Sequence, residues 1–198
     1  MRFLDISTDT NNTYRLKKNE KAVFFLLNRF GSITFELTDI GAEAHIFALF
    51  TGKNTEQKTL SLVQKHSAPN TVSRAIVKTA LFDEATFSSE GLIKIEKKAA
   101  RSDASYECRA LLLSPFAQAS AKPTLEILTN NVKCHHAAAI ASFDPKQLFF
   151  AQSRGLSKKQ AQQLLVDGFF NETLEKMKLL VEKDILPTLR QFLSIAEK

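Results

Sequence analysis

The sequence has no tryptophan and contains few cysteines, glycines and prolines: two, six and five among 198 residues. With Cys108 and Cys134 as its only thiols, it does not fit a disulfide-stapled secreted domain, and we expect both thiols to be free. Long apolar runs are also missing. The longest early run, Val23 to Leu27, is far too short to span a membrane, and no apolar stretch typical of a signal peptide precedes it. These absences predict a cytoplasmic protein.

Positive charge exceeds negative charge, with a formal net charge of +6 and an isoelectric point of about 9.3. The lysines and arginines are scattered, and neither a long basic helix nor a known RNA- or DNA-binding motif occurs. A solvated basic face, or one that meets acidic partner surfaces, explains this composition better than nucleic-acid binding. No Walker A sequence occurs, so the chain is not expected to bind ATP.

Strand-like segments fill the first two thirds of the chain. Ile33, Phe35 and Leu37 alternate with polar residues, and Gly31 and Gly41 punctuate the runs. Further candidates lie at 23–27, 45–50, 59–63, 71–77, 92–95, 106–113, 125–128 and 132–136. Such a series suits a sandwich, a barrel or a solenoid, and the varying intervals do not choose between them. The polar residues 1–14 are predicted to form a loose lead-in.

The end of the chain is helix-like, so the expected boundary separates a β core, residues 1–143, from a helical region, residues 144–198. Asp144 is followed by Pro145 and, three residues on, by Gln147, a capping signature that predicts the start of a short helix. Gly155 is expected to end this helix.

Ser157 and Gln160 form a capping box that predicts a second helix. Asn171 is expected to cap a third helix, and Pro187 to open a last one. The apolar stripes expected on these helices comprise Ala161, Leu164, Leu165 and Phe169; Leu174, Met177, Val181 and Ile185; and Leu189, Phe192, Leu193 and Ala196. Stripes of this kind usually pack on the core. Because the tail is large for the β surface it would cover, one stripe could instead face a partner.

Between Pro123 and Gly155 the chain carries four short motifs in a fixed order: P-x-L-E-I, V-K-C-x-H-x-A, D-x-x-Q-L-F and S-R-G. The combination is far more specific than any one motif alone. It resembles the C-terminal part of the SufB/SufD family of iron-sulfur cluster assembly proteins, and its D-type members in particular. A looser match around His66 and Pro69 extends the resemblance over roughly residues 60–170.

The resemblance implies a right-handed parallel β-helix, a single-stranded solenoid, followed by a C-terminal α-helical tail. Sixteen phenylalanines suit such a fold, because flat rings can stack between its coils. The long N-terminal helical domain of full-length D-type proteins has no counterpart in this sequence, which therefore reads as a short form of the family.

The resemblance also implies a non-catalytic role with two partners. One is a SufB-like subunit, with which a transient iron-sulfur cluster would be shared at the interface through His136 and Cys134. The cysteine that B-type members carry six residues before the motif proline corresponds to Ala117 here. The other partner is a SufC-like ABC ATPase, and the residues implied in its docking are Leu148, Phe149, Phe150, Arg154, Leu164, Leu165 and Phe169.

Each candidate also has a structural interpretation. Cys134 shares a face with Val132 and can be a small buried hydrophobe. His136 can be a hydrogen-bonded residue at a strand end, and His135 is expected to face the opposite side. The structural interpretation is preferred for Cys108, His45 and His66.

Two other functions remain open. The first is a self-sufficient homodimeric scaffold that uses Cys134 and His136 from both copies. The second is a β-helix carbohydrate-active enzyme, which needs converging carboxylates. The acidic residues Asp83, Glu84, Asp103 and Glu107 show no such spacing.

Overall fold

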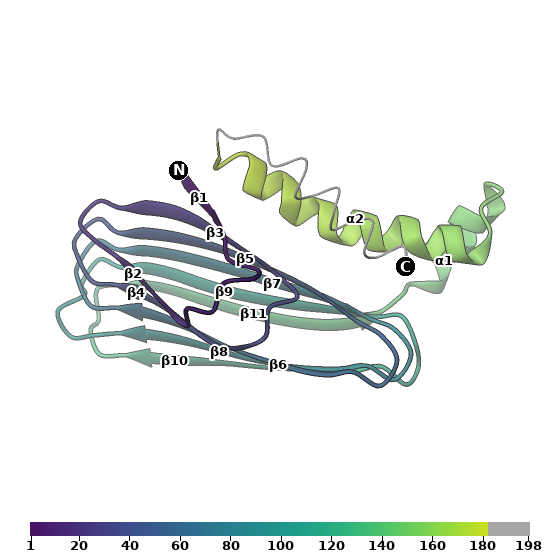
Figure 1. The fold of residues 1–198 in the computed structure, drawn as a ribbon, viewed down its shortest axis with the longest axis horizontal. Helices are drawn as coiled ribbons and strands as arrows, with labels where there is room; N and C mark the ends of the chain where they lie inside the picture. Colours follow the sequence, from purple (N-terminus) through teal and green to yellow (C-terminus); the bar gives the residue numbers. More distant parts are fainter. Residues whose placement is uncertain (182–198) are drawn as a thin grey trace.

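The computed structural model describes residues 1–181, which form a parallel β-solenoid followed by two helices (Figure 1). The strands alternate between two sheets, and every strand pair is parallel, so the predicted parallel β-helix is confirmed. Sheet A contains β1 (Arg2–Asp5), β3 (Lys21–Leu27), β5 (Glu43–Gly52), β7 (Val72–Leu81), β9 (Asp103–Leu112) and β11 (Lys133–Ser142). Sheet B contains β2 (Thr13–Leu16), β4 (Gly31–Leu37), β6 (Gln57–His66), β8 (Thr86–Ile95) and β10 (Gln118–Ile127).

The coils of the solenoid differ in length, which explains why no fixed repeat is visible in the sequence. Ala22 pairs with Ala44, which is 22 residues on, and Ala44 pairs with Ser73, which is 29 residues on. From Ser73 to Ala104 and from Ala104 to Cys134 the spacings are 31 and 30 residues. The early coils are therefore shorter than the later ones, and only the strand register reveals the periodicity.

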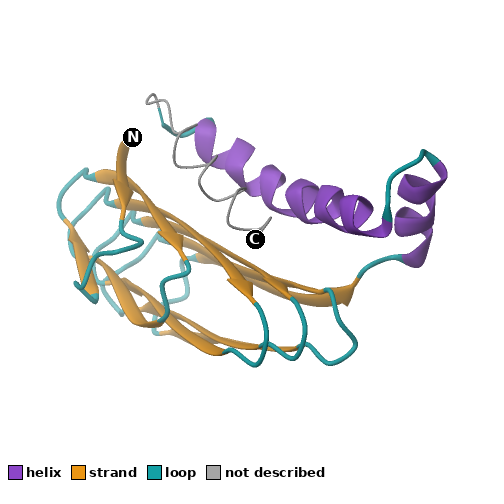
Figure 2. Ribbon diagram, turned by 45° about the vertical axis from the view of Figure 1, so that its right-hand side comes forward, coloured by secondary structure: helices purple, strands orange, loops and turns teal. Residues whose placement is uncertain are grey.

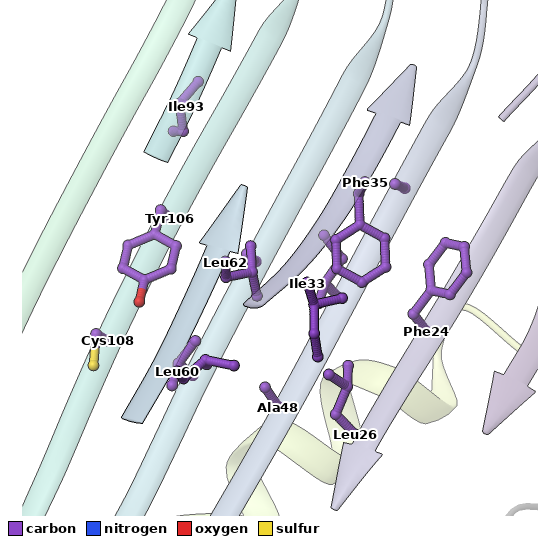
Figure 3. Close-up of a cluster of buried hydrophobic side chains, with 14 of the residues drawn as sticks. Phe24, Leu26, Ile33, Phe35, Ala48, Leu60, Leu62, Ile93, Tyr106 and Cys108 are labelled. Atoms are coloured by element: carbon purple, nitrogen blue, oxygen red, sulfur yellow. The ribbon is translucent and has the colours of Figure 1, made fainter. Parts of the chain in front are cut away.

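The main core fills the space between the two sheets (Figure 3). Inward residues of successive coils stack, as the pairing of Phe24 with Ile46 and of Ile33 with Leu62 illustrates. Aromatic rings contact one another along this core, but most pairs are tilted and not stacked: the Phe50 and Phe87 ring centroids lie 5.2 Å apart at an interplanar angle of 34°, and among the described residues only Tyr14 and Phe35 stack, at 18°. This continuous apolar interior is the main source of stability in such a fold.

The first coil corrects one prediction, because residues 1–14 are not a loose lead-in. They form β1 and the start of β2, which pair with β3 and β4. Arg29 holds the connection between them: its side chain donates to the Ile6 carbonyl oxygen at 2.9 Å, to the Tyr14 hydroxyl at 2.6 Å and to the Asn11 carbonyl oxygen. The polar composition of this segment concealed two short strands, because only a few apolar residues, such as Ile6, reach the core and a buried arginine supplies the remaining contacts.

The first helix, α1 (Pro145–Ser153), begins as predicted. The Asp144 carboxylate accepts a hydrogen bond from the Lys146 backbone N–H at 2.9 Å, and Pro145 occupies the first turn. Gly155 follows the end of the helix with a φ of +91°, a conformation that glycine adopts at little cost.

The second helix, α2 (Lys158–Lys178), begins at the predicted capping box of Ser157 and Gln160. It then continues through Asn171, so the prediction that Asn171 caps a separate helix is wrong. Burial of Phe170 and Leu174 on either side of this position favours a continuous helix over a local cap. Ile185 and the helix expected from Pro187 onward lie outside the described residues.

Helix α2 lies along the outer face of sheet A (Figures 1 and 2). The helix buries Ala161, Val166, Phe170, Thr173, Leu174 and Met177. The apolar ones from Val166 onward form a second core with Val23, Phe25, Phe47, Leu49 and Ala80. The expected stripe is therefore shifted: Leu164 is 55% exposed, and Leu165 and Phe169 are half-buried. The described part of the second expected stripe is confirmed, because Leu174, Met177 and Val181 are buried in the second core.

Candidate functional site

The candidate site lies on β11, the outermost strand of sheet A at the last coil. Cys134 pairs with Ala104, His136 with Tyr106 and Ala138 with Cys108, all of which are buried inward residues. Since side chains alternate along a strand, Cys134 and His136 share the inward face and His135 points to the other face. The predicted arrangement of these three side chains is confirmed.

The last coil is open to solvent. Leu125 and Ile127 of β10 are each 37% exposed and Ile140 of β11 is 44% exposed. Their partners in the preceding coil, Ile93, Ile95 and Ala110, are buried. The same inward rows are therefore covered within the solenoid and uncovered at its end. This makes the end of the solenoid an apolar surface on which Cys134 and His136 lie.

Cys134 is half-buried and packs against the main core. Burial raises the pKa of its thiol, and the nearby Asp103 carboxylate raises that pKa further. The thiol is therefore protonated at neutral pH, unlike the lowered-pKa thiolates of reactive cysteines. His136 is exposed, and it makes no hydrogen bond with any residue of the described segment.

The interior below His136 is filled by Tyr106, whose hydroxyl lies 2.6 Å from the Ser89 hydroxyl oxygen (Figure 3). The ring packs on Gly91 of β8, where a Cβ atom would overlap it. Cys108 lies beside Tyr106 and is 2% exposed, and burial raises its pKa to about 11. The interpretation of Cys108 as a core residue is confirmed.

Within residues 1–181 no three histidine, cysteine, aspartate or glutamate side chains converge in a way that could hold a metal ion. An iron-sulfur cluster generally takes four protein ligands, mostly thiolates and sometimes histidines. Cys134 and His136 are too few to complete such a site. A cluster at the last coil would therefore need ligands beyond those that the described residues supply.

His135, on the opposite face of β11, lines a cleft of about 320 Å³ between sheet A and the end of α2. Ile76 and Leu180 are among the apolar residues of this cleft, and His45 lies at it with Nε2 2.9 Å from a Glu43 carboxylate oxygen. The sequence did not reveal this cleft, because it depends on how the helix packs on the sheet.

His66 is a structural residue, as predicted. It is fully buried, with Nδ1 2.7 Å from the Thr71 hydroxyl oxygen and Nε2 2.8 Å from that of Ser73. Burial lowers its pKa to about 4. The Thr71 hydroxyl oxygen in turn lies 2.7 Å from that of Ser102, so this network joins successive coils at one corner of the solenoid.

The residues predicted to dock an ATPase do not form one row. Phe149 and Phe150 of α1 and Leu164 of α2 are 72%, 60% and 55% exposed, and the Arg154 guanidinium lies 4.8 Å from the Phe150 ring centroid. Leu148 and Leu165 are half-buried, and Phe169 packs against the second core. The exposed apolar surface therefore belongs mainly to α1, and the docking role stays a prediction.

Two charged residues that hold parts of this fold in place were not predicted from the sequence. Arg29 ties down the first coil, and Lys78 is buried on the outer face of sheet A beneath α2. The sequence places Lys78 among apolar residues of the segment Val72–Leu81. The alternation of side chains alone does not show that a helix covers the outer face of this strand.

Residues 28–169 match the family described as "SUF system FeS cluster assembly, SufBD core domain". This range is more than half of the chain, and it includes the open last coil and α1. The chain belongs to the SufBD core domain family. No helix within the described part of the chain is long and apolar enough to cross a membrane.

Curated relatives of this SufBD core domain include the iron-sulfur cluster assembly protein SufD of Escherichia coli, 33% identical over 106 residues, which are 54% of this chain and 25% of that protein. SufD of Bacillus subtilis is 32% identical over 128 residues, 64% of this chain and 28% of that protein. A SufBD family protein of Mycobacterium leprae is 30% identical over 166 residues, 79% of this chain and 42% of that protein. The chain thus spans between about a quarter and two fifths of these relatives.

Proposed function

We propose that this chain is a non-catalytic, D-type subunit of a cytoplasmic SUF iron-sulfur cluster assembly complex. It pairs with a SufB-like subunit, docks a SufC-like ABC ATPase and contributes His136 to a cluster held only transiently. The observation that carries this proposal is the open last coil, where His136 and Cys134 lie among exposed apolar side chains of a SufBD core domain.

Pairing is supported by the chemistry of the open coil. β10 and β11 are edge strands of 10 residues each, so their outer backbone N–H and C=O groups lack strand partners among the described residues. Edge strands of this length are ready templates for another chain. The exposed Leu125, Ile127 and Ile140 would be buried by the same contact.

The D-type assignment rests on the ligands that this chain has and lacks. Ala117, at the position of the B-type cysteine, is 5% exposed and packs into the main core. The thiol of Cys134 is protonated at neutral pH because burial raises its pKa. Neither residue suits the task of accepting sulfur, so the SufB-like partner supplies that thiolate, and His136 supplies an exposed imidazole at the shared face.

Docking of the ATPase is supported by α1. Its Phe149 and Phe150 expose most of their side chains, whereas aromatic rings of this size are usually buried in a monomer. The adjacent Arg154 provides a cation next to this apolar surface. An aromatic and arginine pair of this kind is typical of the centre of a protein interface.

The proposal is tested by co-expression of this chain with its SufB-like and SufC-like partners, followed by size-exclusion chromatography and native mass spectrometry. We expect a stable complex, and we expect the chain purified alone to retain less than one cluster per molecule after anaerobic reconstitution. An isolated chain that holds a full complement of iron and sulfide would overturn the proposal.

A homodimeric scaffold is the second candidate, and it is supported by the position of Cys134 and His136 on the same face of the edge strand β11. Two copies meeting at their last coils would bring together two Cys134 thiols and two His136 imidazoles, which is a four-ligand set. If Cys134→Ala abolishes iron binding while the circular dichroism spectrum is unchanged, this candidate is preferred over the first.

The carbohydrate-active enzyme gains no support from the site. The Asp103 carboxylate lies 2.6 Å from the Arg74 guanidinium, and Glu107 pairs with Arg109. Carboxylates neutralised in this way do not form the converging acid and base that glycoside chemistry needs.

A further inference from the structure

Helix α2 is held on sheet A by an apolar contact with one buried cation in it. Lys78 of β7 is 1% exposed, although its neighbours in the second core, such as Leu49 and Phe170, are apolar. A lysine ammonium is costly to remove from water unless its charge and its hydrogen bonds are satisfied. The Lys78 ammonium therefore requires nearby groups that match its charge and accept its hydrogen bonds.

The partners of Lys78 come from α2. Its ammonium donates to the Phe169 carbonyl oxygen at 2.6 Å and to the Glu172 carboxylate at 2.9 Å, and it lies 4.7 Å from the Phe169 ring centroid. Three interactions with two residues, one helical turn apart, fix the ammonium relative to the helix backbone. A shift of α2 by one residue would break all of them.

Two exposed cations complete the arrangement around Glu172. The Arg109 guanidinium of β9 lies 3.5 Å from the same carboxylate oxygen, and Lys176 of α2 lies 2.7 Å from the other one. The side chains of Arg109 and Lys176 are 43% and 49% exposed. Solvent screens such pairs, so each contributes little compared with the buried contact.

An apolar contact alone does not set a register, since hydrophobic burial is non-directional. The best-attested role of a buried polar or charged group is to specify one alignment among several of similar apolar burial. The N-terminal amine of Met1 also donates to the carbonyl oxygen of Leu180, just beyond the end of α2, at 3.0 Å, and this contact is exposed. Lys78 is thus the buried determinant of where α2 lies.

Helix α1 follows the placement of α2. The two helices contact each other, with Ala151 of α1 and Ala161 of α2 buried. We propose that Lys78 is a positioning residue whose ion pair with Glu172 sets the register of α2 on the solenoid and thereby the place of the exposed Phe149 and Phe150. The inference that this ion pair affects ATPase docking rests on the proposed function. The inference that it sets the register of α2 does not.

The register is measured without any partner. Spin labels are placed at Gln152 on α1 and at Thr59 on the outer face of sheet B, both exposed, in the full chain with Cys108→Ala and Cys134→Ala. We expect a narrow distance distribution in the parent. With Lys78→Met, which keeps the length and removes the charge, we expect the distribution to broaden about twofold or to shift by about one helical turn, 5 Å.

Arg109→Met is the matched control, because it removes an exposed cation from the same carboxylate and should leave the distribution unchanged. A distribution in Lys78→Met identical to that of the parent would overturn the positioning role. Should Lys78→Met fail to fold, Glu172→Gln replaces it, since the amide has the same shape without the charge. An unchanged distribution in Glu172→Gln would overturn the proposed role of the ion pair, because only the charge of residue 172 is removed there.

Binding to the SufC-like ATPase separates this inference from the proposed function. If both hold, Lys78→Met weakens binding by about tenfold, because a mobile docking surface must be ordered on association. If the distance distribution broadens and ATPase binding is unchanged, Lys78 still positions the helix. In that case α1 is not the docking surface, and the proposed function fails at that point.

Discussion

The two ends of the solenoid treat their inward apolar side chains in opposite ways. At the first coil, Ile6 and Leu16 are 3% and 1% exposed, because the segment that Arg29 holds closes over them. At the last coil, Ile127 occupies the same inward row as Leu16 and is 37% exposed, and the inward-facing Ile140 is 44% exposed. The inward apolar side chains are therefore buried at the first coil, whereas at the last coil similar side chains are exposed to solvent.

This difference supports the proposal that another chain binds at the last coil. A solenoid has two ends, and each must be capped or occupied to avoid uncontrolled strand addition. The first coil is capped with four-residue strands and a hydrogen-bonded arginine. The last coil has full-length strands, and the candidate ligands Cys134 and His136 lie on it. The candidate ligands and the exposed inward side chains therefore lie at the same end of the solenoid.

The largest expected effect is on pairing at the open end. Ile140→Glu places a carboxylate on the inward row of β11, where it would be buried without a partner in the complex. We expect affinity for the SufB-like subunit to fall by about a hundredfold or more, measured by isothermal titration calorimetry.

The matched control is Ile40→Glu, since Ile40 lies between β4 and β5 and is 43% exposed, almost the same as Ile140. This variant should bind the partner like the parent chain. Equal affinities of the two variants would show that the open coil is not the pairing surface.

The second prediction concerns the closed interior between the two ends. Burial lowers the pKa of His66 to about 4, whereas an unfolded histidine titrates near 6.5. The unfolded chain then binds a proton that the native chain excludes, so stability is fully present above pH 6.5 and is lost as the pH falls toward 4. The loss reaches up to about 3 kcal/mol.

Urea unfolding of the full chain at pH 7, 5.5 and 4 measures this loss. His66→Asn serves as the comparison, because it removes the titrating group: this variant should be less stable at pH 7 and show a flatter pH dependence in that window. A parent chain whose free energy of unfolding is constant between pH 7 and 4 would contradict the assignment of a neutral, hydrogen-bonded His66.

The sequence predicted the last coil better than the first. Alternation placed Cys134 and His136 on one face correctly, because side-chain direction in a strand is a local property. The alternation pattern did not predict how the first coil is closed, because Arg29 contacts Ile6 and Tyr14, which lie 23 and 15 residues away in the sequence. A long-range contact made by a polar side chain leaves no periodic pattern.

The helices show the same division between local and long-range information. The capping residues Asp144 and Ser157 bond within their own first turn, and both starts were predicted. The buried face of α2 was predicted only in part: Leu174 and Met177 are buried as expected, whereas Leu164 is exposed and Val166 is buried against sheet A. Which face a helix buries depends on the surface it meets, and that surface is assembled from strands far away in the sequence.

The smallest expected effect tests the closed end itself. Arg29→Ala removes the donor to the Ile6 carbonyl and to the Tyr14 hydroxyl, which stay partly or fully buried. We expect the free energy of unfolding to fall by about 2 kcal/mol, since unmet buried acceptors cost roughly 1–3 kcal/mol. Arg15→Ala is the control, because the Arg15 side chain is 66% exposed and its pair with Glu36 should contribute less than about 1 kcal/mol.

Hydrogen exchange should increase in β1 and β2 of Arg29→Ala while pairing with the SufB-like subunit stays unchanged. If pairing weakened together with the first coil, the two ends would not be independent, and the contrast between a closed and an open end would no longer explain where partners bind.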